Sequence, residues 1–316
     1  MKMINTLKEG ERINGVYFCK SRTAATTKNG KEYLSITLQD RTGFLDGKVW
    51  NTTNPGVRED YEAYDYVLVN GEVVSFNGSL QLNIAGIRKA DEGTYDEVDY
   101  MPTSAYDIEE MYTELLGFVD SVKNPHLHQL LDAFFRKDTA FVTEFKRHSA
   151  AKKVHHGFVG GLLEHTLSVT RICAFLADTY SYLDHDLLVS AAMFHDIGKV
   201  YELSGFPEND YTDGGQLLGH IVMGSEMLSN AAAKIEGFPI VLLRQLKHCI
   251  LAHHGEFEYG SPKKPALAEA LALHYADDMD AKLETFKEAL DSPAGQAGEW
   301  LGFNKMLDSN IRKTIV

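Results

Sequence analysis

The stretch VSAAMFHDIGKVYE, residues 189–202, constrains the fold of this chain more than any other segment. The residues from Leu187 to Phe194 that lead into its His-Asp pair are almost all apolar, which predicts a helix buried on nearly every side. The imidazole of His195 and the carboxylate of Asp196 are costly to bury at the end of this helix unless a partner pairs with both. A divalent metal ion fits both groups. A capped helix end with one hydrogen-bonded core histidine explains an isolated His-Asp pair equally well.

The two ends of this helix carry signals of their own. Asp184 or Asp186 is expected to cap the N-terminus, because an aspartate oxygen accepts hydrogen bonds from the first free backbone N–H groups. Gly198 is expected to end the helix. Lys199 follows Asp196 by three residues and completes the segment HDIGK.

Further histidines and an aspartate extend this pattern along the chain. They are His165 in GGLLEHTLSV, His220 in GHIVMG, His253 and His254 in LAHHG, and Asp277 in LHYADDMDAK. We expect them on separate apolar helices, and a helical bundle can direct such side chains at one interior site. Imidazole and carboxylate ligands without thiolate favour manganese, iron, cobalt or zinc over copper or an iron–sulfur cluster.

A histidine, a His-Asp pair and a distant aspartate in this order resemble the HD phosphohydrolase superfamily, over roughly residues 155 to 290. The extra histidines match the members that hold two metals. The resemblance implies one ion among His165, His195, Asp196 and Asp277, and a second among Asp196, His220, His253 and His254. Two such ions generate a hydroxide at neutral pH and clamp the attacked phosphate. Asp196 and Lys199 are the catalytic candidates, with Lys199 neutralising charge on the phosphoryl oxygens.

The helix around Asp277 allows a prediction about which acids point inward. Asp277 shares a face with Leu273 and His274, so its carboxylate is expected to face the site. Asp278 and Asp280 are expected to face solvent. His274 either orients a metal ligand or is a core histidine.

The segment from residue 11 to 90 predicts β-structure. Short runs rich in β-branched and aromatic residues alternate with turn sequences such as KNG, DRTG and FNGS. Five such strands suit a small closed barrel. The pieces LQDRTGFLDGKVW and VLVNGEVVSFNGSLQLNI resemble an OB-fold of the nucleic-acid-binding kind. The expected fold class is multidomain α+β, with an N-terminal five-stranded OB-type β-barrel followed by an all-α HD-domain helical bundle.

OB barrels hold single strands by stacking bases on aromatic rings beside basic residues. The candidates here are Tyr33, Phe44, Trp50 and Phe76 for stacking, with Lys48, Arg41 and Arg88 for phosphates. The alternative is that these aromatics fill the barrel core, since the sequence does not say which face they occupy.

The most basic stretch of the chain, KRHSAAKK, ends in Lys152 and Lys153 and is followed by His155 and His156. These four residues are candidates for guiding a phosphodiester backbone toward the first metal histidine. A solvated helix end explains the lysines equally well. The two histidines are expected to face substrate or support ligands, because the ligand set is complete without them.

Charge is distributed unevenly along the chain. Residues 1–90 hold 12 Lys and Arg against 10 Asp and Glu, whereas the other 226 residues hold 19 against 35. Nine acids and no Lys or Arg lie between residues 91 and 114. We therefore expect an OB-fold domain over residues 1–90, an acidic linker over 91–105 and a helical domain over 106–316. Bound metal cations can supply the positive charge that the surface lacks.

Composition also indicates in which cellular compartment the protein is expected. The three cysteines, Cys19, Cys173 and Cys249, are far apart and include no CxxC pair, which argues against a disulfide framework or a thiolate zinc site. The N-terminal sequence MKMINTLKEGERI has no apolar core of a signal peptide, and no run of about 18 apolar residues occurs. We expect a cytoplasmic protein in a reducing setting that does not engage a membrane.

The combination of an OB-fold, an acidic linker and an HD domain carrying HHGFVGGLLEHTLSV and HDIGK resembles the YhaM-type 3′–5′ exoribonucleases nearly from end to end. The resemblance implies hydrolysis of single-stranded RNA from the 3′ end to nucleoside 5′-monophosphates by a metal-activated hydroxide. Single-stranded DNA is a second substrate that it leaves open. It favours manganese, two ions per chain, over cobalt, iron or magnesium. The C-terminal tail matches loosely, which leaves the contacts of a homo-oligomer open.

Two other functions use the same residues. An HD-type phosphodiesterase acting on a small signalling nucleotide needs the same ligands and makes the OB-fold regulatory. A binding module with a metal-stabilised but inactive HD domain is the option without catalysis, and the complete ligand set with Lys199 argues against it.

Overall fold

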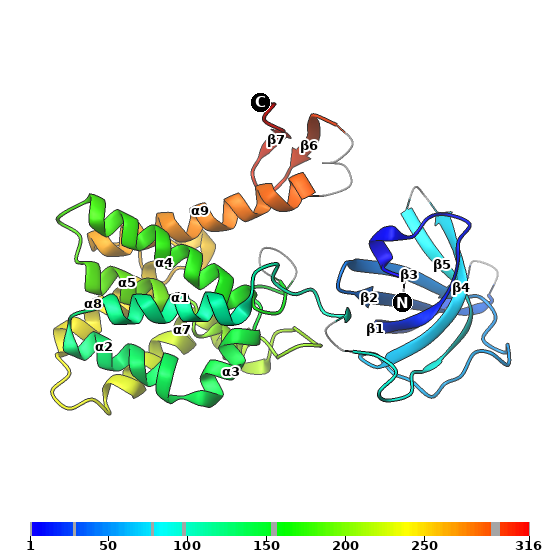
Figure 1. Ribbon diagram of the computed structural model, residues 1–316, viewed down its shortest axis with the longest axis horizontal. Helices are drawn as coiled ribbons and strands as arrows, with labels where there is room; N and C mark the ends of the chain where they lie inside the picture. The colour runs from blue at the N-terminus through cyan, green and yellow to red at the C-terminus, as the bar shows by residue number, and fades with distance from the viewer. Residues whose placement is uncertain are drawn as a thin grey trace. The chain divides into compact units, whose positions relative to one another are not determined.

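The computed structural model describes residues 2–27, 30–76, 79–96, 99–152, 157–291 and 298–315. The chain divides into two compact units (Figure 1). The barrel unit comprises Met1–Thr103 with Phe206–Glu208, and the helical unit comprises Ser104–Gly205 with Asn209–Val316. This combination of a β-barrel with a helical unit confirms the predicted fold class.

The barrel unit is a closed barrel with strand order β1-β2-β3-β5-β4. A 3₁₀ turn, η1 (Ile4–Thr6), precedes the strands β1 (Arg12–Thr26), β2 (Glu32–Asp40), β3 (Gly43–Val49), β4 (Tyr66–Phe76) and β5 (Ser79–Lys89). All neighbouring pairs are antiparallel except β3 and β5, which run parallel and close the barrel. Closure pairs the two outer strands of the sheet, β3 and β5, with each other.

Strand β3 shows how the sequence separates the inside of the barrel from its outer face. Leu45 and Val49 are buried in the barrel core, whereas Phe44 and Lys48 alternate with them and point outward. Gly47 also faces inward, where a Cβ atom would lie 2.6 Å from Cδ1 of Ile84. The absence of a side chain at Gly47 therefore lets the core close tightly at this point.

Part of the acidic segment expected to act as a linker packs within the barrel unit. Tyr95 stacks on Tyr66 of β4 with ring centroids 4.1 Å apart. The buried side chain of Gln39 donates a hydrogen bond from Nε2 to the backbone carbonyl of Tyr100 at 2.9 Å. The chain passes to the helical unit at Ser104.

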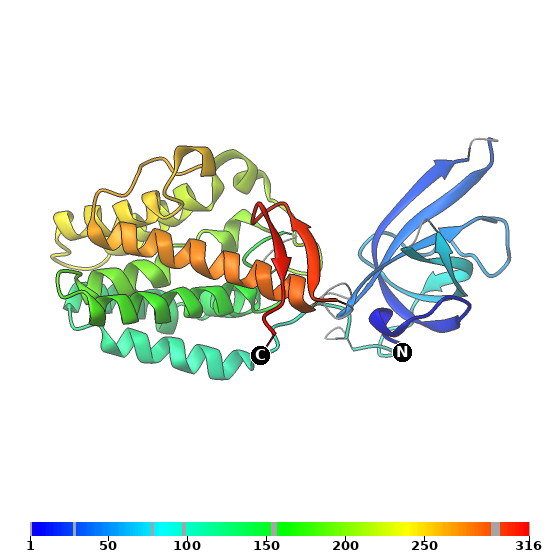
Figure 2. The ribbon, with the colours of Figure 1, turned by 90° about the horizontal axis from the view of Figure 1, so that it is seen from above.

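The helical unit is a bundle followed by a short hairpin, as Figure 2 shows for α9 and the two strands after it. Its elements are α1 (Ile108–Ser121), α2 (Pro125–Asp132), the π-helical turn η3 (Ala133–Lys137), α3 (Thr139–Arg147), α4 (Gly161–Thr179), α5 (His185–Phe194), α6 (Lys199–Glu202), α7 (Asp213–Ala232), α8 (Ile240–Ala252), the 3₁₀ turn η4 (Phe257–Tyr259), α9 (Ala268–Asp291), β6 (Trp300–Asn304) and β7 (Ser309–Arg312). Within the described part of the chain, no helix combines the length and hydropathy needed to cross a membrane.

Helix α5 is the centre of this bundle. All residues from Leu187 to Phe194 are buried, and the helix packs against α4, α8 and α9. The Asp184 side chain caps it by accepting a hydrogen bond from the Leu187 N–H at 2.8 Å. The prediction of a helix buried on nearly all sides is confirmed.

Gly198 differs from its predicted role. Helix α5 ends at Phe194, and the following turn carries His195 and Asp196 before α6 begins at Lys199. The φ angle of Gly198 is −64°, so this residue does not end α5 in the left-handed conformation. Gly198 is instead where the chain crosses α7. A Cβ atom there would lie 2.1 Å from the carbonyl oxygen of His220 and 2.8 Å from the backbone nitrogen of Gly224.

We predict that Gly198→Ala lowers the free energy of unfolding by about 1–3 kcal/mol, because α6 and α7 must separate to admit a methyl group. Gly117→Ala is the matched control, since Gly117 lies in α1 and a Cβ atom there would have no neighbouring atom within 4 Å. That substitution is expected to stabilise the protein by about 0.5–1 kcal/mol. Urea unfolding of both variants measures the difference, and equal effects would contradict the close approach at Gly198.

Candidate functional site

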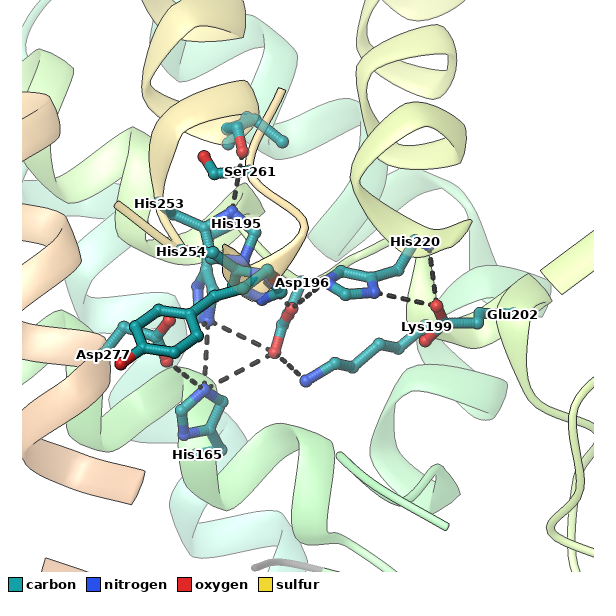
Figure 3. Close-up of polar contacts among 12 residues, drawn as sticks. His165, His195, Asp196, Lys199, Glu202, His220, His253, His254, Ser261 and Asp277 are labelled. Atoms are coloured by element: carbon teal, nitrogen blue, oxygen red, sulfur yellow. Dashed lines mark hydrogen bonds and ion pairs between the residues drawn. The ribbon is translucent and has the colours of Figure 1, made fainter. Parts of the chain in front are cut away.

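The helical unit brings the seven predicted metal ligands together in its interior (Figure 3). They lie on α4 (His165), in the turn after α5 (His195 and Asp196), on α7 (His220), directly after α8 (His253 and His254) and on α9 (Asp277). Positions separated by more than a hundred residues in sequence thus share one interior site.

Six of these side chains form two groups of three. Within each group, the three candidate ligand atoms lie within 4.8 Å of one another. The first group is His165, His195 and Asp277. The second group is His220, His253 and His254. His195 and His253 are fully buried, whereas His220 is partly exposed.

The Asp196 carboxylate lies between the two groups, as Figure 3 shows. Its Oδ2 atom is 3.5 Å from Nε2 of His165 and 3.3 Å from Nε2 of His195. Its Oδ1 atom is 3.4 Å from Nε2 of His220 and 3.8 Å from Nε2 of His253. Each oxygen of one buried carboxylate therefore faces one histidine group, which is the arrangement of a bridging ligand.

All five histidines are held through Nδ1, which directs Nε2 into the site. Backbone carbonyl oxygens hold three of them: Ala192 for His195 at 2.7 Å, Ile250 for His253 at 2.7 Å, and Tyr259 for His254 at 2.8 Å. Carboxylates hold the other two: Asp280 for His165 at 2.7 Å and Glu202 for His220 at 2.9 Å. A partner that accepts the Nδ1–H hydrogen bond leaves Nε2 as the atom available to a metal.

Three buried atoms support a metal at this site. Oδ1 of Asp196, Nε2 of His220 and Nε2 of His253 are buried, and no hydrogen-bond partner is assigned to them among the described residues. A buried polar atom without a partner costs free energy. A divalent ion satisfies both imidazole nitrogen and carboxylate oxygen, so the residues present fit a metal centre.

The protonation states of these groups also suit metal binding. Burial lowers the pKa of His253 well below its ordinary value, and burial likewise lowers the pKa of His254, so both rings are neutral. Burial opposes ionisation of Asp277, but the hydrogen bond to His165 together with the charges of the surrounding histidines outweighs this and lowers its pKa. Metal ligands must be neutral imidazole or ionised carboxylate.

His165 differs from the other histidines. Burial would lower its pKa, but the hydrogen bonds to Asp277 and Asp280 outweigh this and raise it to about 10. Its Nε2 lies 3.2 Å from Oδ1 of Asp277. Acting as a ligand through Nε2 therefore requires His165 to lose the proton shared with Asp277.

Lys199 extends to the bridging carboxylate from α6. Its Nζ atom lies 2.5 Å from Oδ2 of Asp196. Burial opposes the charge on Lys199, but Asp196 outweighs this and raises the lysine pKa above its ordinary value. The ion pair likewise lowers the pKa of Asp196 against the effect of burial. The site thus keeps a positive charge beside its central carboxylate.

Asp280 corrects an expectation from sequence. It is buried rather than facing solvent, and besides His165 it accepts a hydrogen bond from the Ser168 hydroxyl. Asp280 lies three residues after Asp277 and therefore on the same helix face. That spacing was the available signal. Asp278 is partly exposed and pairs with Lys282 at 2.7 Å.

His274 and Glu202 support the site from outside it. The Nδ1–H of His274 donates to the backbone carbonyl of His253 at 2.8 Å, which agrees with the orienting role among the two alternatives. Gly255 makes room for this ring, since a Cβ there would lie 2.3 Å from Cε1 of His274. Glu202 was not identified from the sequence at all.

A cleft with a volume of about 420 Å³ opens onto this centre. Its lining includes His165, Lys199, Asp277, His254 and the aromatic side chain of Tyr259. The metal-ligand atoms are therefore accessible to a substrate from one side.

Of the four residues predicted to guide a phosphodiester backbone, the structure describes one. Lys152 pairs with Asp210, and its Nζ lies 5.9 Å from the ring centroid of Tyr211. It is absent from the described lining of the cleft. Lys153, His155 and His156 lie outside the described residues.

On the barrel unit, two of the predicted stacking residues and the predicted phosphate-binding lysine form one outer cluster. The rings of Tyr33 and Trp50 lie 4.8 Å apart between centroids, with Nζ of Lys48 5.8 Å from the Tyr33 ring. Phe44 lies on the same face of β3 with 60% of its surface exposed, and Trp50 is 43% exposed. The alternative that these aromatics fill the barrel core is therefore wrong.

We predict that Mn²⁺ raises the melting temperature of the helical unit and that EDTA reverses this. At 100 times its dissociation constant an ion adds about 2.7 kcal/mol, which corresponds to roughly 5–10 °C. Asp196→Asn should abolish the shift, because the central carboxylate is lost. The control is Asp178→Asn, an exposed position on α4. Differential scanning calorimetry measures the melting temperatures. A Mn²⁺-induced shift of equal size in both variants would contradict the assigned centre.

Two known families match this chain. The OB-fold nucleic acid binding domain matches residues 18–90, and the HD domain matches residues 162–282. The solved second OB-fold domain of replication protein A from Methanococcus maripaludis matches 30% of this chain and 98% of its own, with 20% identity. Its TM-score of 0.22 is too low to support any conclusion.

Two relatives match nearly the whole chain. The 3′–5′ exoribonuclease YhaM of Bacillus velezensis strain FZB42 is 37% identical over 284 residues, which cover 89% of this chain and 88% of the relative. The 3′–5′ exoribonuclease YhaM of Geobacillus sp. strain WCH70 is 36% identical over 285 residues, covering 89% and 86%. With this identity over 89% of its length, and with both an OB-fold and an HD domain, the chain belongs to the family of the YhaM 3′–5′ exoribonucleases.

Proposed function

We propose that this protein is a metal-dependent 3′–5′ exoribonuclease that degrades single-stranded RNA to nucleoside 5′-monophosphates. The observation that carries the proposal is the position of Asp196, with one carboxylate oxygen toward each histidine group at the end of an open cleft. Kinship with proteins named as exoribonucleases supports RNA as the substrate. Single-stranded DNA has the same stacking and phosphate features and is included as a second substrate.

The proposed centre takes two divalent ions, with manganese preferred over cobalt, iron or magnesium. His165, His195 and Asp277 would hold one ion, His220, His253 and His254 would hold the other, and Asp196 between the two groups would contribute to both. Two ions in one site lower the pKa of water and neutralise charge on the attacked phosphodiester. The neutral ring of His253 and the ionised carboxylate of Asp277 suit metal binding, whereas His165 must release its shared proton when an ion binds.

Lys199 is the proposed catalytic residue beside the ions. Its side chain lies in the cleft lining, and its ammonium remains charged next to Asp196. A fixed positive charge close to the attacked phosphorus stabilises negative charge that develops on the phosphoryl oxygens. Because the lysine pairs with a ligand that is itself fixed by α5, its position is set before substrate arrives.

The outer cluster of the barrel, Tyr33, Lys48 and Trp50, is the proposed grip for single strands. Trp50 is held in place by a hydrogen bond from its Nε1 to Oδ1 of Asn83 at 3.0 Å. Lys48 donates to the Ser35 hydroxyl at 2.5 Å and stays close to the Tyr33 ring. Aromatic faces accept any base by stacking, which suits an enzyme that degrades many sequences.

End-labelled RNA tests the proposed function. A 5′-labelled strand of about 20 nucleotides should shorten one nucleotide at a time in Mn²⁺, because the protein removes residues from the 3′ end. A 3′-labelled strand should release its label at once as a mononucleotide. EDTA should stop both reactions, and cyclic dinucleotides should remain intact. Electrophoresis and thin-layer chromatography give the products.

Two variants control this assay. Lys199→Ala should bind both ions yet lower kcat roughly 10²–10³-fold, whereas Asp196→Asn should lose both metal and activity. Release of nucleotides from the 5′ end, internal cleavage, or faster hydrolysis of a cyclic dinucleotide would overturn the exoribonuclease proposal. The last result would favour a small signalling nucleotide as substrate.

We predict that Tyr33→Ala and Trp50→Ala each raise the Kd for a 20-nucleotide RNA roughly 5- to 150-fold, since one stacked base is worth about 1–3 kcal/mol. Hydrolysis of a small chromogenic phosphodiester should be unchanged, because that substrate needs no grip. Phe175→Ala serves as the control, because Phe175 is an exposed aromatic on α4 of the helical unit. RNA binding that falls equally in all three variants, measured by fluorescence anisotropy, would refute this assignment.

A further inference from the structure

We propose that Glu202 and Asp280 are positioning residues with divided tasks: Glu202 sets the geometry of one metal ion and Asp280 that of the other. The inference rests on the proposed two-ion centre. Each carboxylate contacts one histidine, and the two histidines belong to different groups.

Glu202 holds His220 by two hydrogen bonds to the same oxygen. Oε1 accepts from the backbone N–H of His220 at 2.9 Å and from its Nδ1–H at 2.9 Å. Both the ring and the backbone of His220 are thereby tied to α6. The Glu202 side chain is 12% exposed, so little water competes for these bonds.

The backbone bond has a structural cause in α7. Gly219 has φ 74° and ψ 157°, which interrupts the helix directly before His220. A helix that restarts after a break leaves its first N–H groups without internal acceptors. Glu202 accepts the hydrogen bond from the first of these groups, as an N-capping side chain does. The break in α7 therefore makes His220 depend on a residue from another helix.

The position of Glu202 is itself fixed. Its backbone carbonyl accepts a hydrogen bond from the Thr212 N–H at 2.9 Å. Gly215 of α7 packs against it so closely that a Cβ would lie 2.1 Å from the Glu202 carbonyl oxygen. Glu202 is thus a rigid support and leaves His220 little freedom to turn.

Asp280 plays the corresponding part for His165. Its Oδ2 atom accepts from the Nδ1–H of His165 at 2.7 Å, and its Oδ1 atom accepts from the Ser168 hydroxyl. One helical turn earlier, Asp277 contacts the opposite nitrogen of the same ring at 3.2 Å. Helix α9 therefore holds His165 at both nitrogens.

The other three histidines are supported by backbone carbonyls, which no side-chain substitution removes. Carboxylate partners orient a ligand ring and increase its basicity, and their loss typically weakens metal binding 10–100-fold. Asp196 faces both groups and cannot distinguish them. Glu202 and Asp280 are therefore the side chains through which the two ions can be tuned separately.

Metal content of the full-length protein tests this division without reference to activity. Equilibrium dialysis against Mn²⁺ should give two ions for the wild type. Glu202→Ala and Asp280→Ala should each retain one tightly bound ion and bind the other 10–100-fold more weakly. Glu202→Gln and Asp280→Asn, which keep an acceptor oxygen, should recover part of the lost affinity. Glu226→Ala on α7 and Glu284→Ala on α9 are the controls and should retain both ions.

Double variants identify which ion is lost. Adding Glu202→Ala to His220→Ala should change metal binding no further, because Glu202 acts through that histidine. Adding Asp280→Ala to His220→Ala should also weaken binding of the other ion, which is assigned to the group of His165. A purely structural role would instead lower the melting temperature in EDTA and weaken both ions together.

Three results would overturn the inference: both ions weakened equally in either single variant, wild-type affinity in both, or fewer than two ions in the wild type. The proposed function fails differently. A wild type that binds two ions and leaves single-stranded RNA intact refutes the exoribonuclease and leaves the division of tasks standing. An active enzyme whose variants keep both ions refutes the division alone.

Discussion

The helical unit depends on one buried carboxylate. Asp196 is 2% exposed at the end of α5, where an isolated negative charge would be strongly disfavoured. Lys199 and histidines from three other parts of the chain surround it, so its burial is offset only when those helices are in place. The apolar α5 fixes the carboxylate in the core, and the surrounding helices must bring polar groups to it. The same arrangement of helices is therefore needed both to bury Asp196 and to assemble the candidate metal site.

Local patterns made much of this predictable. The near-continuous apolar run before His195 indicates a buried helix, and the seven histidines and aspartates lie on, or directly after, helices that the same periodicity identifies. The barrel follows from strands separated by turn residues. Gly198 was assigned a different role from the sequence because its function is a contact with α7, more than twenty residues further on. A pattern within one helix carries no information about such a crossing.

The two supporting carboxylates illustrate the same limit in different ways. Asp280 follows the helical spacing of Asp277, but the run ADDMD offers three acids, and only the packing of α4 on α9 decides which are buried. Glu202 becomes a partner of His220 because α7 breaks at Gly219, and a glycine in a helical run does not announce a break. The roles of both residues are therefore set by tertiary packing, which the local sequence pattern does not show.

A net charge of −14 is compatible with a polyanionic substrate once charge is assigned to particular sites. Most of the acids lie outside residues 1–90. Within residues 1–90, basic and acidic residues are nearly equal in number. The proposed grip on the barrel uses stacking, which gains little from net charge. At the proposed centre the attacked phosphate meets bound cations and Lys199, close charges in a partly buried site where screening by water is weak. The local field therefore governs the reaction, whatever the sign of the total.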